Sequence, residues 1–169
     1  DARPKPARDS MGADHRELRT AFGCYATGIA VVTCRAEDGS PVGMTVNSFT
    51  SVSLEPPLVL WCLDKSSHRF APFAKAPSYA VNVLRAEQQD VSRAFAAPDA
   101  ALEAEAFGVW KTGAPILLDC LAQFDCEVFE RVDAGDHLLL VGRVVQFAAA
   151  EAGDPLIYYR SGYGSGVKR

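Results

Sequence analysis

The chain has 169 residues, a length typical of one domain with its own hydrophobic core. Hydrophobic residues make up 49% of the chain and charged residues 22%, which excludes wholesale disorder and collagen-like repeats. With 17 Lys and Arg against 21 Asp and Glu, the net charge is -4, so the chain lacks the broad basic field of a nucleic-acid-binding protein.

The chain is expected to begin with a flexible arm and a helix. Residues 1–13 combine two prolines with mixed charge and little apolar content, which is typical of a mobile terminus. Asp14 and Glu17 then resemble a capping box at a helix start. Four apolar residues follow at helical spacing, which predicts one apolar face: Leu18, Ala21, Phe22 and Tyr25.

Strands dominate the rest of the chain. β-Branched and apolar runs separated by turn residues predict strands at 29–34, 42–50, 58–63, 79–84, 121–132, 137–147 and 155–159. Helices are expected only around Phe70 and over Glu87–Ala96, whereas 97–115 has no regular pattern and 161–166 is flexible by composition. Most strands are joined as hairpins. We therefore predict a mainly β, antiparallel barrel with peripheral helices, formed by residues 14–163 and followed by a flexible tail, 164–169.

The location and metal content of the protein are predicted from what the sequence lacks. Its longest apolar run, 58–63, is far shorter than a membrane span. The N-terminal segment lacks the charged and then apolar pattern of a signal peptide, so we expect a cytoplasmic protein without membrane contact. The five cysteines lie mostly among apolar residues and read as free, buried thiols in a reducing compartment. Without a C-x-x-C pair or clustered histidines, no metal site is predicted.

The segment Met44–Phe49 is unusual for a core strand because it carries polar side chains on both faces. Strand alternation sorts its residues into two sets: Thr45, Asn47 and Phe49 on one face, and Met44, Val46 and Ser48 on the other. Buried polar groups need hydrogen-bond partners, and a polar, planar ligand along the strand would supply them. A solvated edge strand is the alternative interpretation.

Two further sites carry groups that could bind a ligand. Asp64, Lys65 and Ser66 follow an apolar strand and precede a predicted helix, so a cation, hydroxyls and a helix N-terminus could hold a phosphate there. An ordinary helix cap with solvated charges is the alternative. His137 opens a strand after a hairpin loop and could face a cleft, or it could be an exposed histidine without a role.

Five phrases of the sequence, taken together, resemble the short-chain flavin reductases, the reductase partners of two-component flavin monooxygenases. They occur in the family's order over about residues 18–163: FGCYATGIAVVTC, GMTVNSFTSVSLEPPLVLWCLDKSS, YAVNVL, AGDHLLLVGRV and PLIYYRSGY. The resemblance implies a split β-barrel that binds flavin, a homodimer, and NAD(P)H-dependent reduction of FMN or FAD for a separate monooxygenase.

The resemblance also implies where the ligands lie. The segment Met44–Phe49 would run beside the flavin ring, and Leu63–Ser66 would lie near the ribityl phosphate, which Arg93 could also reach. His137 would contact the nicotinamide. The full set of implied cofactor-binding residues is Thr27, Met44, Thr45, Val46, Asn47, Ser48, Phe49, Leu63, Asp64, Lys65, Ser66, Phe70, Arg93, His137 and Tyr163. Val46 departs from the Ala common in the family and could alter flavin preference.

The absence of an evident acid–base pair fits such a reaction, because in hydride transfer the cofactors carry the chemistry and the protein positions them. We therefore give His137 a positioning role and expect no catalytic acid or base. A non-enzymatic flavin-binding protein on the same barrel is the alternative, since a fold does not fix a function. The sequence leaves open FMN against FAD, NADH against NADPH, and the identity of the partner oxygenase.

Overall fold

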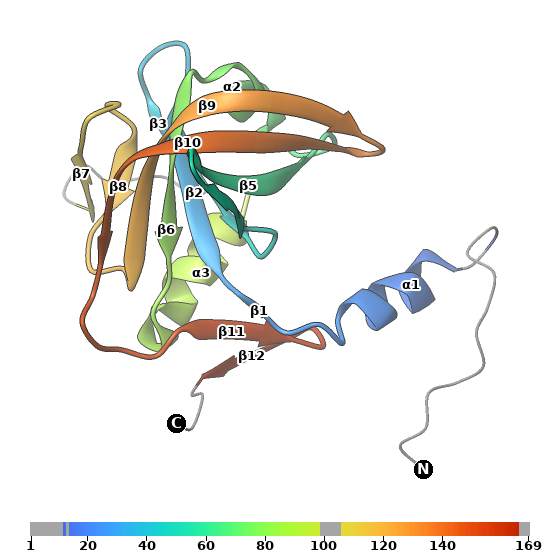
Figure 1. Ribbon diagram of the computed structural model, residues 1–169. Coiled ribbons are helices and arrows are strands. Elements are labelled where there is room, and N and C mark those ends of the chain that lie inside the picture. The colour runs from blue at the N-terminus through green and yellow to red at the C-terminus, as the bar shows by residue number, and fades with distance from the viewer. Residues whose placement is uncertain (1–11, 13, 99–105, 166–169) are drawn as a thin grey trace.

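The computed structural model describes residue 12, residues 14–98 and residues 106–165 (Figure 1). The predicted arm, 1–13, lies outside the described residues except for Gly12, as do residues 166–169 of the predicted tail. The helices are α1 (His15–Phe22), α2 (Phe70–Lys75), the short 3₁₀ helix η1 (Ala86–Gln88) and α3 (Gln89–Ala96). The strands are β1 (Thr27–Gly28), β2 (Ala30–Arg35), β3 (Pro41–Val46), β4 (Thr50–Leu54), β5 (Pro57–Asp64), β6 (Ser78–Val83), β7 (Phe107–Val109), β8 (Pro115–Leu117), β9 (Ala122–Ala134), β10 (His137–Ala149), β11 (Leu156–Tyr159) and β12 (Gly162–Ser165).

A seven-stranded sheet forms the body of the molecule, in the order β3-β2-β6-β9-β10-β5-β4. Every neighbouring pair in it is antiparallel. Its longest hairpin joins the 13-residue strands β9 and β10 through Gly135 and Asp136. Gly135 has a φ of 60°, a left-handed conformation that glycine adopts without steric strain. The predicted mainly β, antiparallel architecture is confirmed.

The main sheet curls around a core that contains side chains from β2, β3, β5, β6, β9, β10 and α2. Trp61 lies at its centre, with its ring edge-on to Phe73 at 5.1 Å and to Tyr79 at 5.9 Å between centroids. All three aromatic side chains are almost fully buried. Burial of each large apolar side chain contributes roughly 1.5–3 kcal/mol, so this cluster is a principal source of stability. We call it the main core.

Strand β2 is covered on both faces, which explains why four of its six residues are apolar and why Thr33 is also fully buried. Val32 points into the main core, whereas Val31 belongs to a second core with Leu84 and Leu156. Successive side chains of a strand point to opposite faces, so only a strand buried on both sides needs apolar residues throughout.

A small second sheet, in the order β1-β11-β12, lies below the main sheet in Figure 1. Composition predicted a flexible segment at 161–166, and strand β12 corrects this for Gly162–Ser165, which pair with β11. The connecting residues Arg160 and Ser161 have φ values of 47° and 63°, as a tight two-residue hairpin requires. Tyr163 is thereby held beside Tyr158 in the neighbouring strand.

Two other expectations needed correction. The strand predicted at 42–50 ends at Val46, and Thr50–Leu54 form a separate edge strand that pairs with β5. Within the irregular segment predicted at 97–115, β7 forms a two-stranded antiparallel sheet with β8. Three-residue strands such as these are too short to show a periodic pattern.

Helix α1 begins where it was predicted, because the side chain of Asp14 accepts a hydrogen bond of 2.9 Å from the backbone N–H of Arg16. None of its residues is buried. Phe22 is 67% exposed and Tyr25, just after the helix, is 79% exposed, so the predicted apolar face is present but uncovered in the single chain.

None of the helices among the described residues is long and apolar enough to cross a lipid bilayer.

All five cysteines are free thiols, and three of them are buried as predicted. Burial raises the pKa of Cys34 and Cys126 to about 12 and that of Cys120 to about 11, so these thiols are protonated and unreactive near neutral pH. Cys24 is exposed and Cys62 is half-buried.

Candidate functional site

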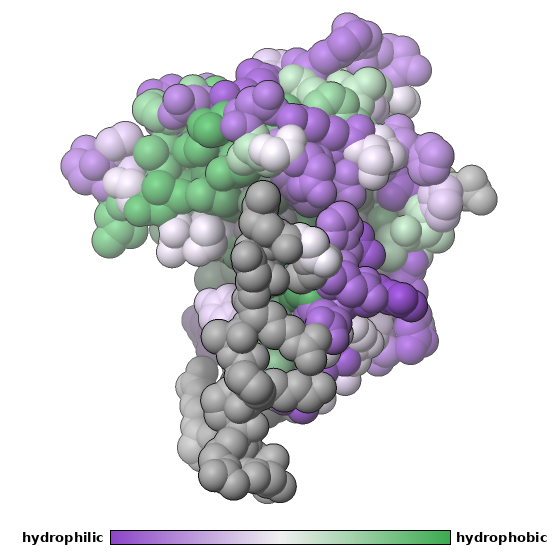
Figure 2. Space-filling view, turned by 90° about the vertical axis from the view of Figure 1, so that its right-hand side faces the viewer, coloured by the Kyte–Doolittle hydropathy of each residue, from purple (hydrophilic) through white to green (hydrophobic). Residues whose placement is uncertain are grey.

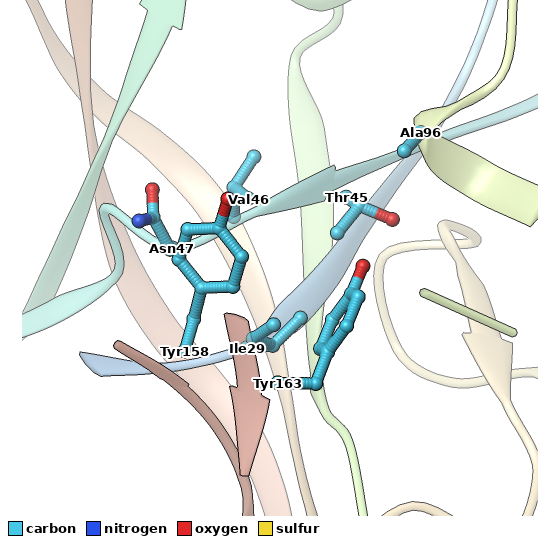
Figure 3. A pocket seen from close by; sticks show the side chains of 7 residues that line it. All are labelled: Ile29, Thr45, Val46, Asn47, Ala96, Tyr158 and Tyr163. Carbon is cyan, nitrogen blue, oxygen red and sulfur yellow. The ribbon is translucent and has the colours of Figure 1, made fainter. Parts of the chain in front are cut away.

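An open pocket of about 240 Å³ lies where the end of β3 faces the β11–β12 hairpin (Figure 3). Its walls also include the last residue of α3 and the residue between β1 and β2. Pockets that enclose a drug-sized ligand usually measure about 300–1,000 Å³, so this open pocket can receive the ring portion of a ligand but does not enclose a whole dinucleotide. The lining residues are Ile29, Thr45, Val46, Asn47, Ala96, Tyr158 and Tyr163.

The segment Met44–Phe49 supplies one wall of this pocket, but only in part. Met44 and Phe49 pack against the main core instead, and the Phe49 ring lies 5.5 Å from that of Phe124. The expected alternation over the whole segment was wrong because β3 ends at Val46 and the chain turns there. Of its six residues, only 45–47 line the pocket.

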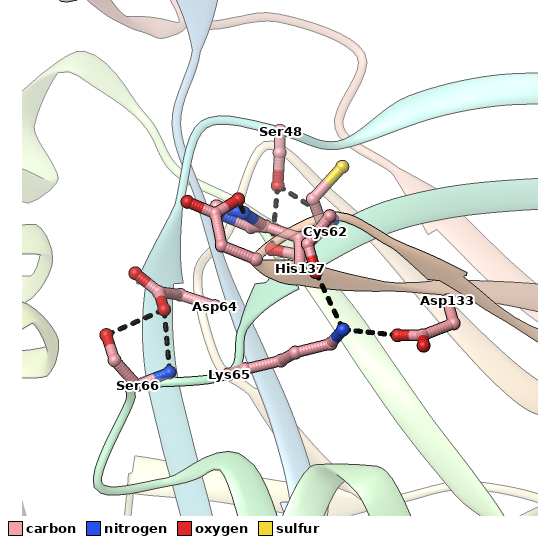
Figure 4. Close-up of polar contacts among 9 residues, drawn as sticks. Ser48, Cys62, Asp64, Lys65, Ser66, Asp133 and His137 are labelled. Atoms are coloured by element: carbon pink, nitrogen blue, oxygen red, sulfur yellow. Dashed lines mark hydrogen bonds and ion pairs between the residues drawn. The ribbon is translucent and has the colours of Figure 1, made fainter. Parts of the chain in front are cut away.

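The protein itself supplies partners for two of the polar side chains in this segment. The hydroxyl of Thr45 donates to the carbonyl of Ser92 at 2.7 Å. The hydroxyl of Ser48 accepts from the backbone N–H of Cys62 at 3.0 Å and donates to its carbonyl at 3.3 Å, which fastens the turn to β5 (Figure 4). Asn47 is exposed at the pocket and has no hydrogen-bond partner among the described residues. Its amide is therefore the group of this segment that is available to a ligand.

Tyr163 and Arg93 lie together near Thr45. The Tyr163 hydroxyl is 3.0 Å from the hydroxyl of Ser92, and the Arg93 guanidinium carbon lies 5.7 Å from the centroid of the Tyr163 ring. Tyr158 meets the same ring edge-on at 5.6 Å. The Arg93 side chain is 62% exposed, so its charge lies at the rim of the pocket.

Thr27 is adjacent to the pocket but does not line it. It pairs directly with Tyr158 across β1 and β11, so the two side chains share one face of the small sheet. The hydroxyl oxygen of Thr27 is buried and has no hydrogen-bond partner among the described residues. An unpaired buried hydroxyl costs about 1–3 kcal/mol unless a water or a ligand supplies the partner.

The loop after β5 brings together most of the predicted phosphate-binding residues (Figure 4). The Asp64 carboxylate accepts from the hydroxyl and the backbone N–H of Ser66, both at 2.7 Å, and these two hydrogen bonds lower the pKa of Asp64. The Lys65 ammonium donates to the Gly135 carbonyl at 2.7 Å and forms an ion pair with Asp133. An ammonium has three donors, so one remains for a ligand.

His137 lies directly across from Asp64, because the two residues are paired in the β5–β10 register. Its Nδ1 is 2.7 Å from the Asp136 carboxylate, and the side chain is 38% exposed. The hydrogen bond and charge of His137 lower the pKa of Asp136. His137 thus stands with the loop of Asp64–Ser66 rather than among the pocket-lining residues.

Two predicted site residues are structural. Leu63 is fully buried in the main core, and Phe70 packs against that core at the start of α2. Sequence reasoning missed three pocket-lining residues, Ile29, Ala96 and Tyr158, although two of them stand in the quoted phrases FGCYATGIAVVTC and PLIYYRSGY. It also missed Ser92, because a serine within a helix gives no sequence signal of its contacts with Thr45 and Tyr163.

Residues 22–166 match the family model described as the flavin reductase like domain. The chain belongs to the flavin reductase-like family. It is 42% identical over 153 residues to the FMN reductase (NADH) SmoA of Agrobacterium fabrum, covering 90% of this chain and 87% of that protein. It is 44% identical over 151 residues to the reductase component of the flavin-dependent trigonelline monooxygenase of Acinetobacter baylyi, covering 88% of this chain and 48% of that protein.

Solved structures of similar proteins share this flavin reductase fold. The Streptomyces globisporus NADH:FAD oxidoreductase SgcE6, in complex with NAD and FAD fragments, superimposes with a TM-score of 0.85 at 31% identity, over 95% of this chain and 96% of that one. The chain spans about half the length of the curated relatives that it matches at 44% identity.

Proposed function

We propose that the protein is an NAD(P)H-dependent flavin reductase, which transfers a hydride from a nicotinamide to FMN or FAD and supplies the reduced flavin to a separate monooxygenase. The observation that carries the proposal is the pocket in which Thr45, Val46 and Asn47 face Tyr158 and Tyr163, in a chain of this family. The names of the similar SmoA and SgcE6, and the NAD and FAD fragments in the SgcE6 structure, support the choice of substrates.

The residues of the pocket fit a flat, polar-edged ring. Val46 and Ile29 offer apolar surface, and the rings of Tyr158 and Tyr163 offer aromatic walls. The Asn47 amide has both donors and an acceptor, so it can match the carbonyl and N–H groups at the edge of an isoalloxazine or a carboxamide. Flavin and nicotinamide together supply the hydride chemistry. The chain's own contribution is to hold the flavin ring and the nicotinamide ring in position against each other, because no side chain in the pocket is placed as a general base.

Two charged groups suit the nucleotides' phosphates. Arg93 lies at the rim of the pocket, and Lys65, in the loop after β5, keeps one free donor besides its bonds to Gly135 and Asp133. We propose that Lys65 and Ser66 hold the flavin phosphate, that Arg93 assists, and that His137 orients the nicotinamide. Because all five cysteines are free thiols, we further propose a cytoplasmic location, where thiols stay reduced.

Anaerobic turnover tests the proposal. The protein is mixed with NADH and a large excess of FMN without oxygen, and the bleaching of the flavin absorbance is followed. A reductase is expected to bleach many flavins per chain at a rate proportional to enzyme concentration. Bleaching that stops at one flavin per chain, or that does not exceed the protein-free rate, would indicate the alternative, a flavin-binding protein without this activity.

Lys65→Ala is expected to weaken the binding of FMN about ten-fold or more, because a charge-assisted hydrogen bond contributes about 1.5–3 kcal/mol. Binding of riboflavin, which has no phosphate, should change little. Titration of flavin fluorescence measures both affinities. Lys75→Ala is the matched control, since Lys75 is also paired with a carboxylate, that of Glu37. Equal weakening of both flavins by Lys65→Ala would contradict the placement of the phosphate.

His137→Ala is expected to raise the KM for NADH about five-fold or more, the cost of one lost polar contact, and to leave the KM for flavin nearly unchanged. Steady-state rates with each substrate varied in turn measure the two constants. His15→Ala, an exposed histidine of α1, serves as the control. If the KM for NADH is unaltered, His137 does not belong to the site.

We also propose that the protein is a homodimer. The outer face of β5, β9 and β10 carries a run of partly exposed apolar side chains: Leu60 pairs with Val141, and Leu139 pairs with both Cys62 and Val132. None of these residues is among the side chains that pack the buried cores of the described chain. At the level of these strands, Figure 2 shows a broad apolar area on the molecular surface. Extended apolar patches of this kind usually mark an interface.

Light scattering tests the assembly. A homodimer should have twice the chain mass of 18.2 kDa. Val141→Lys should lower that mass to a single chain, whereas Val109→Lys, at an exposed apolar residue on β7, should leave the dimer intact. A wild-type mass of 18.2 kDa would refute the homodimer.

A further inference from the structure

Ser92 connects two walls of the pocket that come from distant parts of the sequence. It lies in α3 and is fully buried, with none of its surface exposed. Its carbonyl accepts the hydroxyl of Thr45 on β3 at 2.7 Å, and its own hydroxyl lies 3.0 Å from that of Tyr163 on β12. One residue of the helix thus fixes both sides of the pocket.

The position of the Tyr163 ring depends on such contacts more than that of a residue in the main sheet does. Its strand β12 is an edge strand of the small sheet, bonded only to β11. Its neighbours Gly162 and Gly164 add no side-chain packing and leave the backbone with extra conformational freedom. The position of the Tyr163 ring therefore rests on side-chain contacts, and Figure 3 shows that ring among the side chains that line the pocket.

Three contacts hold the ring. Ser92 binds its hydroxyl, the Arg93 guanidinium lies 5.7 Å from its centroid, and Tyr158 meets it edge-on at 5.6 Å. Only the contact with Ser92 is a directional hydrogen bond to a side chain that is itself immobilised by burial. Serine inside a helix often bonds a carbonyl of its own preceding turn. Here its hydroxyl meets that of Tyr163.

We infer that Ser92 is a positioning residue for the reaction: by holding the hydroxyl of Tyr163, it fixes the width of the pocket and so the affinity for the nicotinamide that stacks there. The inference rests on the proposed function. It adds that the hydrogen bond between Ser92 and Tyr163, and not Tyr163 alone, determines nicotinamide binding. Ser92 itself lies behind Tyr163 and does not line the pocket.

A double-mutant cycle tests this inference. Ser92→Ala and Tyr163→Phe each remove one partner of the same hydrogen bond, so each should raise the KM for NADH by a similar factor, about five-fold. The double variant should show no further increase, because the bond is already lost in either single variant. The value of kcat at saturating NADH should stay close to that of the wild type.

Thr33→Val is the matched control for removing a buried hydroxyl. Thr33 is fully buried and bonds the carbonyl of Pro115, away from the pocket. This variant should lower the melting temperature and leave the KM for NADH unchanged, which separates loss of stability from loss of positioning. Additive effects of Ser92→Ala and Tyr163→Phe, or a Ser92→Ala variant that loses only melting temperature, would overturn the inference. The wild-type turnover measurement tests the proposed function independently of this cycle.

Discussion

Gly142→Ala is expected to destabilise the protein by about 3 kcal/mol or more, because a methyl group at this position has no room. A Cβ atom on Gly142 would overlap the Tyr79 hydroxyl, and it would lie only 2.7 Å from Tyr79 Cζ and 3.0 Å from the Cβ of Cys126. Tyr79 cannot move aside easily, since it is buried in the main core and its hydroxyl donates to the Leu140 carbonyl at 3.1 Å. Thermal unfolding should show a fall in melting temperature of roughly 6–12 °C.

The matched control is Gly108→Ala, since a Cβ atom on Gly108 of β7 meets no atom within 4 Å. Its melting temperature should stay within about 2 °C of the wild type, as is usual for surface substitutions. In a Tyr79→Phe background, which lacks the overlapping oxygen, the cost of Gly142→Ala should be smaller. If Gly142→Ala unfolds at the wild-type temperature, the packing described for β6, β9 and β10 is incorrect.

Ala96→Trp is expected to lower kcat/KM for flavin reduction at least about 100-fold, equivalent to about 2.7 kcal/mol of transition-state stabilisation. Ala96 lines the pocket from the end of α3, and its side chain is exposed, so an indole can project into the space without disturbing either core. A pocket of about 240 Å³ has little room for a ligand ring beside an indole. Steady-state turnover with NADH and FMN measures the loss.

Ala94→Trp provides the control, because Ala94 is exposed on the same helix and does not line the pocket. Both variants should unfold at temperatures close to that of the wild type. Ala94→Trp should keep nearly full activity. Wild-type activity in Ala96→Trp would place the reaction elsewhere in the molecule.

The predicted secondary structure was right where a long pattern or a specific residue determined it. The alternation over β9 and the apolar run of β5 identified two strands of the main sheet, and Asp14 identified the start of α1. The end of β3 at Val46 could not be predicted, because polar residues follow in a run that still suits a strand locally. What ends the strand is tertiary: Ser48 bonds the backbone of Cys62 and draws the chain across to β5.

The structure brings some of the predicted site residues together and places others elsewhere. Residues 45–47 and Tyr163 line one pocket, but Leu63 and Phe70 support the core. Sequence patterns cannot separate a polar residue that faces a ligand from one that bonds the protein. Asn82 illustrates the same limit, because its buried amide donates to Val31 and accepts from Leu117, joining β6 to β2 and β8.

The fold explains why the pocket lies where it does. The chain turns at Val46, the end of edge strand β3, and crosses to β4 at the other edge of the main sheet, and the β11–β12 hairpin of the small sheet lines the pocket next to this turn. Helix α3 contacts both walls of the pocket through Ser92, which bonds Thr45 on β3 and Tyr163 on β12. Residues from four separate parts of the sequence thus form one aromatic-walled surface, with Arg93 at its rim.

A crystal structure of the protein soaked with FMN tests the central claim most directly. We expect electron density for the isoalloxazine ring against Val46 and Asn47, with Tyr163 bordering the space in which a nicotinamide would stack. Ordered flavin at any other surface, or no flavin density at a saturating concentration, would contradict it.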